Sequence, residues 1–319
     1  MSELMKAVII NQYGSADVLQ YSDVDLPRIT QTQMLVLVHA TSLNPVDWKI
    51  RTGQLQLITG YKFPKILGFD VSGEVVEVGE GVTRFKPGDR VYARLDNLPG
   101  GSYAEYAAVS DSCACLKPNN ITHEQAAAVP LAALTALQAL RDNGQIQRGH
   151  RVLINGGAGG VGSFAVQIAK AMDTEVTAVC STKNIELVKS LGADSIIDYT
   201  QQDFTMDTAQ YDIIFDAVGN QSFSRCQHIL KPNGVYITTL PTPDSLVQSF
   251  LTFIFPGKKA KLVIVKSSGQ DLAYLKELIE ADKMRSVIEK TYPLSDVAVA
   301  HSISEQGHVV GKLVITVLS

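Results

Sequence analysis

The strongest constraint on the fold is the glycine-rich segment Asn155–Gly162, which holds five glycines in eight residues. It follows the apolar run 151–154, which predicts a buried strand, and precedes a predicted helix at about 160–172. A Gly-x-Gly-x-x-Gly loop between strand and helix is typical of dinucleotide sites, because the glycines allow a tight turn and a close approach to a pyrophosphate. We therefore predict dinucleotide binding at Gly157, Ala158, Gly159, Gly160, Val161 and Gly162.

Strands and helices alternate through the rest of this region. Strands are predicted at 151–154, 175–180, 195–197, 211–217 and 234–239, and helices at 184–191 and 221–230. Nearly continuous apolar strands alternating with helices indicate a parallel sheet that is covered on both faces. The expected fold class is α/β, with a doubly wound, parallel-sheet Rossmann domain.

Residues 1 to about 120 have a different pattern, in which short apolar runs are separated by turn signals. They predict a small barrel-like β domain. Thr122 and Gln125 have capping-box spacing and should begin an alanine-rich helix that Pro130 interrupts. A further helix follows at about 131–142. The last 50 or so residues predict a helix at 270–281 and a strand at 311–317 that returns to the first domain.

Composition excludes several classes of function. The chain is 45% hydrophobic and 19% charged with a net charge of −4, so it offers no field for nucleic acid or for an anionic membrane. The longest apolar stretch, Val247–Phe255, is too short to span a bilayer, and the polar N-terminus does not resemble a signal peptide. We expect a cytoplasmic protein with free thiols at Cys113, Cys115, Cys180 and Cys226.

The end of the second Rossmann strand bears on the choice of dinucleotide. An NAD site usually carries an acidic residue there, whereas this strand runs into Ser181-Thr-Lys183. A hydroxyl and an ammonium suit the 2′-phosphate of NADPH, so we predict NADPH with Ser181 and Lys183 on that phosphate. The alternative is that Lys183 is an ordinary solvated lysine.

A series of motifs along nearly the whole chain resembles the zinc-free quinone oxidoreductase branch of the medium-chain dehydrogenase/reductase superfamily. The motifs are Asn44–Gly53, Leu67–Gly73, Phe85–Val91, Tyr103–Tyr106, Leu134–Ala136, Asn155–Gly162, Leu191–Asp194 and Gly311–Val314. The resemblance implies a GroES-like β-barrel catalytic domain (1–122, completed by 267–319) and a Rossmann NADPH-binding domain (123–266). It also implies an active site between them and a homodimer joined through the edges of the Rossmann sheets.

The resemblance also bears on metal binding. Zinc-dependent relatives have Cys where this chain has Asn44, and Gly-His-Glu where it has Gly68-Phe-Asp70. Asn is a poor zinc ligand and Phe69 cannot coordinate a metal, so no metal is expected.

By family position, Asn44 and Asp47 face the nicotinamide end of the site, and both are candidate catalytic residues with Tyr61 as a third. The cofactor contacts implied in addition to the glycine loop, Ser181 and Lys183 are Asn44, Thr135, Tyr199, Gly219, Leu240 and Lys312.

Each assignment has a structural alternative. Asn44 is also suited to forming a turn before Pro45, Asp47 to pairing with Arg51, and Thr135 to bonding its own helix backbone. Tyr61 also fits as an ordinary packed tyrosine. The aromatic run Ser249–Pro256 fits a substrate pocket wall, a subunit contact or plain core.

The leading functional prediction is hydride transfer from NADPH to a small electrophile, either a quinone or an α,β-unsaturated carbonyl (enone). Two alternatives remain: an enoyl-thioester reductase, and an NADPH-binding redox sensor without turnover. The retained Asn44-Pro-Val-Asp47 turn argues modestly for activity.

Overall fold

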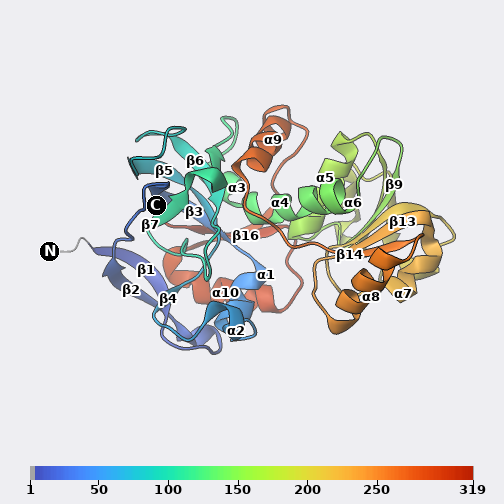
Figure 1. Cartoon of the computed structure of the whole chain (residues 1–319), viewed down its shortest axis with the longest axis horizontal. Helices are drawn as coiled ribbons and strands as arrows, with labels where there is room; N and C mark the ends of the chain where they lie inside the picture. Colours follow the sequence, from blue (N-terminus) through green and yellow to red (C-terminus); the bar gives the residue numbers. More distant parts are fainter. Residues whose placement is uncertain (1–3, 319) are drawn as a thin grey trace. The chain divides into compact units, whose positions relative to one another are not determined.

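The computed structural model describes residues 4–318 (Figure 1), and the chain divides into two compact units. The first comprises the chain up to Leu134 together with Lys266–Ala281 and the residues from Ser286 onward. The second comprises Thr135–Val265 and Asp282–Arg285. The first boundary falls inside helix α4 (Pro130–Gln138), so α3 (His123–Ala127) belongs to the first unit.

The second unit is built on a six-stranded parallel sheet. Its strand order is β11-β10-β9-β12-β13-β14, with β11 at Ser195–Asp198, β10 at Glu175–Cys180, β9 at Arg151–Asn155, β12 at Tyr211–Asp216, β13 at Leu230–Thr238 and β14 at Lys259–Leu262. The chain runs from β9 outward to β11, returns to β12 and then runs outward to β14, which confirms the predicted doubly wound α/β arrangement.

Helices connect these strands. They are α5 (Gly160–Ala171), α6 (Ile185–Ser190), α7 (Phe223–Cys226) and α8 (Pro243–Ile254). The helix expected at 221–230 is shorter than predicted, because a 3₁₀ turn at Gln227–Ile229 follows α7. The helix expected at 131–142 is α4 followed by a π-type turn at Ala139–Asn143. Figure 1 shows α8 beside the edge strand β14.

The first unit contains two sheets. A three-stranded sheet has the order β2-β1-β4, with β1 at Leu4–Ile10, β2 at Leu19–Asp25 and β4 at Lys65–Ile66. A larger sheet has the order β15-β16-β3-β5-β6-β8, with β15 at Ile288–Pro293, β16 at Lys312–Thr316, β3 at Gln33–Leu43, β5 at Asp70–Val78, β6 at Arg90–Arg94 and β8 at Ala114–Leu116. Strand β7 (Tyr106–Ser110) also pairs with β3.

The C-terminal part of the chain completes this unit. Strand β16 pairs antiparallel with β3, which confirms the predicted return to the first domain, and both strands lie together in Figure 1. The helices of the unit besides α3 are α1 (Pro45–Arg51), α2 (Gln56–Thr59), α9 (Gly269–Glu280) and α10 (Val297–Glu305). The capping box at α3 is confirmed: Gln125 N donates to Thr122 Oγ1 at 3.3 Å, and Thr122 N donates to Gln125 Oε1 at 3.0 Å.

Within residues 4–318, no helix has the length and apolar character needed to cross a bilayer. The four cysteines are free and buried, as predicted. Burial raises the pKa of the Cys113 and Cys180 thiols to about 11, so neither is a reactive thiolate at neutral pH.

Candidate functional site

The glycine loop joins β9 to α5 by a very close approach of backbone to backbone. A Cβ on Gly162 would lie 2.0 Å from Gly156 O, and one on Gly157 would lie 2.9 Å from the Ala178 Cβ, so neither position has room for a side chain. At Gly159, the N-cap of α5, a Cβ would meet only Gly156 O, at 3.4 Å. The loop is therefore packed on its inner side and open at the helix N-terminus, where free amides can bind phosphate.

The carboxyl ends of the neighbouring strands bring four other predicted cofactor residues, Ser181, Tyr199, Gly219 and Leu240, to one edge of the sheet. Ser181 follows β10, and Tyr199 follows β11 and donates its backbone N–H to Cys180 O at 3.1 Å. Gly219 and Leu240 follow β12 and β13, and a Cβ on Gly219 would lie 2.7 Å from the Leu240 Cβ. Ligands of doubly wound folds bind at this edge.

Two polar residues, Ser181 and Lys183, lie just after the end of β10. Ser181 is buried and accepts from Asn184 Nδ2 at 3.2 Å, whereas Lys183 is exposed. On the neighbouring strand β11, the carboxylate residue Asp198 is paired with Cys180, the last residue of β10. Asp198 accepts hydrogen bonds from Thr182, Thr200 and Gln201, and these bonds hold its pKa below the usual range.

A buried carboxylate that the sequence analysis did not single out holds the loop after β12. Asp216 is fully buried and accepts from Asn155 Nδ2 at 2.8 Å and from the backbone N–H of Gly219 at 2.9 Å. It also accepts from Gln221 N and from the Tyr236 hydroxyl, at 2.9 and 3.0 Å. Asp216 therefore links the glycine loop to the turn that carries Gly219.

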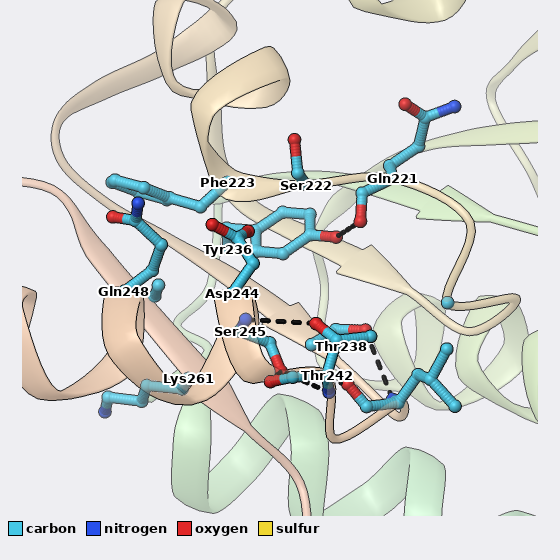
Figure 2. Close-up of a pocket in the computed structure, with 13 residues that line it drawn as sticks. Gln221, Ser222, Phe223, Tyr236, Thr238, Thr242, Asp244, Ser245, Gln248 and Lys261 are labelled. Atoms are coloured by element: carbon cyan, nitrogen blue, oxygen red, sulfur yellow. Dashed lines mark hydrogen bonds between the residues drawn. The ribbon is translucent and has the colours of Figure 1, made fainter.

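A pocket lies next to this turn, between β13, α8 and the segment 219–223 (Figure 2). Figure 2 shows polar side chains in its lining, including Tyr236, Thr242, Ser245 and Gln248. The Tyr236 hydroxyl lies 2.9 Å from Gln221 O across one wall, so its one proton is shared between this oxygen and Asp216. Gly219 and Leu240 form part of the rim, so the pocket adjoins two of the predicted cofactor residues.

In the first unit, the structure brings Asn44 and Lys312 together with a third residue, Asp70. The Asn44 side chain donates from Nδ2 to Asp70 Oδ2 at 2.7 Å and accepts from Lys312 Nζ through Oδ1. Lys312 Nζ also donates to Leu43 O at 2.9 Å and lies 3.8 Å from Asp70 Oδ2. All three side chains are buried, and burial lowers the pKa of Lys312.

Asp47 lies one helical turn from Asn44 and is fully buried. Its Oδ2 accepts from Asn44 N and from the Tyr103 hydroxyl, each at 2.8 Å. Burial raises the pKa of Asp47 to about 7 despite these hydrogen bonds. The alternative pairing of Asp47 with Arg51 is wrong, because Arg51 forms its ion pair with Glu305 of α10.

One predicted residue of the first unit lies outside this network. Tyr61 is 66% exposed in the loop between α2 and β4, and none of the hydrogen bonds of Asn44 or Asp47 in the described part of the chain reaches it. Thr135 is buried in α4, at the start of the second unit. Among residues 4–318, no group of three or more His, Cys, Asp or Glu side chains is arranged to hold a metal ion.

Two family models match the chain. The alcohol dehydrogenase GroES-like domain covers residues 30–119, and the zinc-binding dehydrogenase model covers residues 191–315. The chloroplast envelope quinone oxidoreductase homolog of Arabidopsis thaliana is 36% identical over 324 residues, covering 98% of each chain. The chain belongs to the quinone oxidoreductase-like medium-chain dehydrogenases/reductases.

Other members of this superfamily agree in sequence and fold. The chloroplastic NADPH-dependent alkenal/one oxidoreductase of Arabidopsis thaliana is 39% identical, with 98% of this chain and 79% of that protein covered. The solved structure of the quinone oxidoreductase from Coxiella burnetii has a TM-score of 0.89 and 35% identity, covering 99% of this chain and all of that one. The first unit thus contains the GroES-like domain, and the protein is an oxidoreductase.

Two residues that join this network, Asp70 and Tyr103, were not predicted as site residues of this oxidoreductase. Both fall in motifs that carried the family resemblance, Leu67–Gly73 and Tyr103–Tyr106. Asp70 gave a signal in the sequence, a charged group at the start of an otherwise apolar strand, where a buried polar atom needs a partner. Tyr103 precedes β7 and gave no such local signal. The partners are Asn44 and Asp47.

Proposed function

We propose that this protein transfers hydride from NADPH to quinones or α,β-unsaturated carbonyls without zinc. The observation that carries the proposal is that the Asn44 amide is hydrogen-bonded to both Lys312 and Asp70. In zinc-dependent relatives a cysteine ligand occupies the Asn44 position. Here the position is part of a buried hydrogen-bond network, in which the Asn44 amide bonds to the Lys312 ammonium and to the Asp70 carboxylate.

The donor chemistry of these residues supports a zinc-independent reaction. Asn44 uses its amide nitrogen on Asp70 and its amide oxygen on Lys312, so a metal bound at that oxygen would compete with the Lys312 ammonium. Phe69, at the histidine position of zinc-dependent relatives, is buried and has no coordinating atom. Lys312 already supplies a positive charge close to Asp70, which disfavours adding a divalent cation.

The second unit is suited to holding NADPH. The open side of Gly159 and the amides at the start of α5 fit the pyrophosphate, and Ser181, Lys183 and Tyr199 are our choice for the 2′-phosphate. Asp198, saturated by three neighbouring side chains, has little capacity left for a ribose hydroxyl. We assign Gly219 and Leu240 to the nicotinamide half, with Asn44, Thr135 and Lys312 as further contacts.

The proposed reaction needs polarisation and alignment more than a strong acid. NADPH supplies a hydride, and with one proton an enone becomes a saturated carbonyl or a quinone becomes a hydroquinone, leaving NADP⁺. Asn44 is held rigidly by two charged partners, which suits it to positioning. Asp47, with its pKa near 7, is the group of this network that exchanges a proton near neutral pH. Tyr61 is retained as a second candidate for proton supply.

The proposal is tested by following NADPH oxidation at the nicotinamide absorbance with matched panels of quinones and enones, and NADH as the control cofactor. Turnover of either panel with NADPH supports the proposal and selects the acceptor class. Tight NADPH binding with no turnover on either panel contradicts it and favours the redox sensor. Activity that requires added zinc, or that is lost with a zinc chelator, contradicts the zinc-independent part.

Lys183 provides a test of cofactor choice. Lys183→Glu places a carboxylate where a 2′-phosphate would bind, so we expect NADPH affinity to fall by at least about ten-fold, with little change for NADH. The measurement is cofactor titration by fluorescence or calorimetry. Lys189→Glu, a change at another exposed lysine of the same region, is the matched control. Equal losses for both cofactors would remove Lys183 from the phosphate site.

A further inference from the structure

Helices α1 and α10 of the first unit meet at a contact that contains ionisable side chains. Asp47 and Arg51 are four residues apart on α1, so they lie on one face of that helix, and the same spacing places His301 and Glu305 on one face of α10. The two helices are in contact and lie side by side in Figure 1. Asp47, Arg51 and His301 are fully buried. Such groups are rarely buried without partners, so each needs an explanation.

The contacts of these residues form a column that leads from the surface to Asp47. Glu305, whose side chain is 35% exposed, pairs with Arg51 Nη2. Burial and, after it, the nearby charge of Arg51 lower the pKa of the His301 imidazole to about 3, so the ring is neutral. The His301 ring lies edge-on to the Tyr103 ring, with 5.7 Å between their centroids. The Tyr103 hydroxyl in turn donates to Asp47 Oδ2 at 2.8 Å. From solvent inward, the column therefore contains Glu305, Arg51, His301, Tyr103 and Asp47.

Several polar atoms of this column have no hydrogen-bond partner in the protein. Among residues 4–318, nine buried side-chain nitrogen and oxygen atoms lack such a partner, and five of the nine belong to the column. They are Asp47 Oδ1, Arg51 Nε and Nη1, and His301 Nδ1 and Nε2. Buried polar atoms are nearly always hydrogen-bonded, to protein or to ordered water. Five such atoms at one helix contact therefore point to one shared occupant.

The donor and acceptor types of these atoms select water as the occupant. Arg51 offers only N–H donors, the neutral His301 ring offers one donor and one acceptor, and ionised Asp47 accepts at Oδ1. An anion would be repelled by the Asp47 carboxylate and could not bond to the acceptor nitrogen of His301. A metal cation would lie against the Arg51 guanidinium, which repels it. Water donates and accepts at once, and a buried water typically makes about three hydrogen bonds to groups of this kind.

We propose that ordered water between α1 and α10 connects Asp47 to solvent at Glu305 and resupplies Asp47 with protons, with His301 as the positioning residue that keeps this water in line. The inference rests on the proposed function, in which each acceptor reduced consumes one proton. When Asp47 gives up that proton, its Oδ1 takes another from the adjoining water. Each water takes a proton from the next, and bulk water at Glu305 supplies the last. At each transfer one O–H bond breaks and one forms, with no oxidation or reduction. Arg51 is always protonated, so it orients the water by donating and transfers no proton.

The first test looks for the water directly and needs neither a variant nor turnover. In a high-resolution crystal structure of the full chain, we expect ordered water about 2.7–3.2 Å from Arg51 Nε and from a nitrogen of His301. His301→Phe keeps a ring against Tyr103 but has no ring nitrogen, so it should lose the water bonded there. His301→Gln has both a donor and an acceptor and should keep it. A dry contact in the wild type, with these atoms bonded to protein groups instead, overturns the proposal.

The second test measures proton supply during NADPH oxidation, with an acceptor that the wild type reduces. We expect His301→Phe to lower kcat by at least about ten-fold and to raise the solvent deuterium isotope effect on kcat, with KM and the Kd for NADPH unchanged. His301→Gln should recover most of the rate. Ser302→Ala, at an exposed neighbour on α10, is the matched control and should behave as the wild type. Circular dichroism and thermal unfolding establish that the variants are folded.

The outcomes separate this inference from the proposed function. If the wild type reduces neither quinones nor enones, the proposed function fails and the proton path fails with it. If the wild type turns over and His301→Phe keeps its kcat and isotope effect, the proposed function stands and the proton path fails. If His301→Phe loses kcat with an unchanged isotope effect and His301→Gln does not recover it, His301 is a structural residue and the proposal is overturned.

Discussion

At the scale of single residues, the network around Asn44 contains two buried carboxylates and one buried ammonium. Asp70 is satisfied by Ser42 at 2.6 Å, by Asn44 and by Leu131 N at 2.7 Å, and it lies within 4 Å of Lys312. Asp47 receives two hydrogen bonds on one oxygen, and its Oδ1 has no partner. Because Lys312 lies closer to Asp70, Asp47 is the carboxylate whose charge is less compensated.

Asp47 should make folding stability depend on pH. Its pKa is raised from 3.8 to about 7 by burial, so the folded state holds this proton more tightly than the unfolded state. That contribution is fully present below about pH 4 and is lost as pH rises towards 7. Asp47→Asn cannot titrate, so we expect the wild type to lose free energy of unfolding relative to Asp47→Asn across this range. Urea unfolding at a series of pH values measures the difference.

Tyr103→Phe is the matched variant for this effect. The Tyr103 hydroxyl lowers the pKa of Asp47, so its removal should move the loss of stability to higher pH. His301, whose pKa burial lowers to about 3, acts in the opposite direction between pH 3 and 6.5. His301 is present in all three proteins, so its effect on stability cancels when they are compared. A difference between wild type and Asp47→Asn that does not vary with pH would contradict the assignment.

At the scale of elements, Gly162 makes the contact between β9 and α5 possible. Gly162→Ala would place a Cβ 2.0 Å from Gly156 O, so strand and helix must separate. We expect a loss of several kcal/mol in the free energy of unfolding, as for other severe overpacking. Gly159→Ala, where the nearest atom lies at 3.4 Å, should leave the thermal midpoint nearly unchanged and weaken NADPH binding. Equal thermal midpoints for the two variants would refute this account.

Local signals in the sequence predicted many elements well. Strand β10 was expected at Glu175–Cys180 and has those bounds, and the Thr122–Gln125 capping box forms as predicted. Helix α8 was not recognised as a helix, and the sequence left open whether its aromatic run is exposed, which the structure shows it to be. A period of 3.6 residues identifies an apolar face but not what covers it, and in α8 the hydrogen-bonded polar face is the one that packs on the sheet.

At the scale of the whole molecule, the candidate site depends on residues that are far apart in the sequence. Lys312 and Asn44 are 268 positions apart and meet because β16 pairs with β3. Motif positions suggested both residues, but no local pattern could give their contact or the hydrogen bond that joins Asn44 to Asp70. Tyr61 shows the converse, since a family-based candidate lies in an exposed loop outside the hydrogen-bond network.

The division into two units predicts which strands lose stability when a core residue is truncated. Ile315 of β16 is buried in the core of the first unit, and Ile214 of β12 is buried in that of the second. Replacing either with Ala should cost about 2–5 kcal/mol, because each change leaves a cavity in a packed core. Since each core lies within its own compact unit, we expect Ile315→Ala to speed hydrogen exchange mainly in β3, β5 and β16, and Ile214→Ala mainly in β9, β12 and β13. Exchange measured peptide by peptide tests both variants in the full chain. If each variant accelerates exchange equally in both units, the two cores unfold as one cooperative structure.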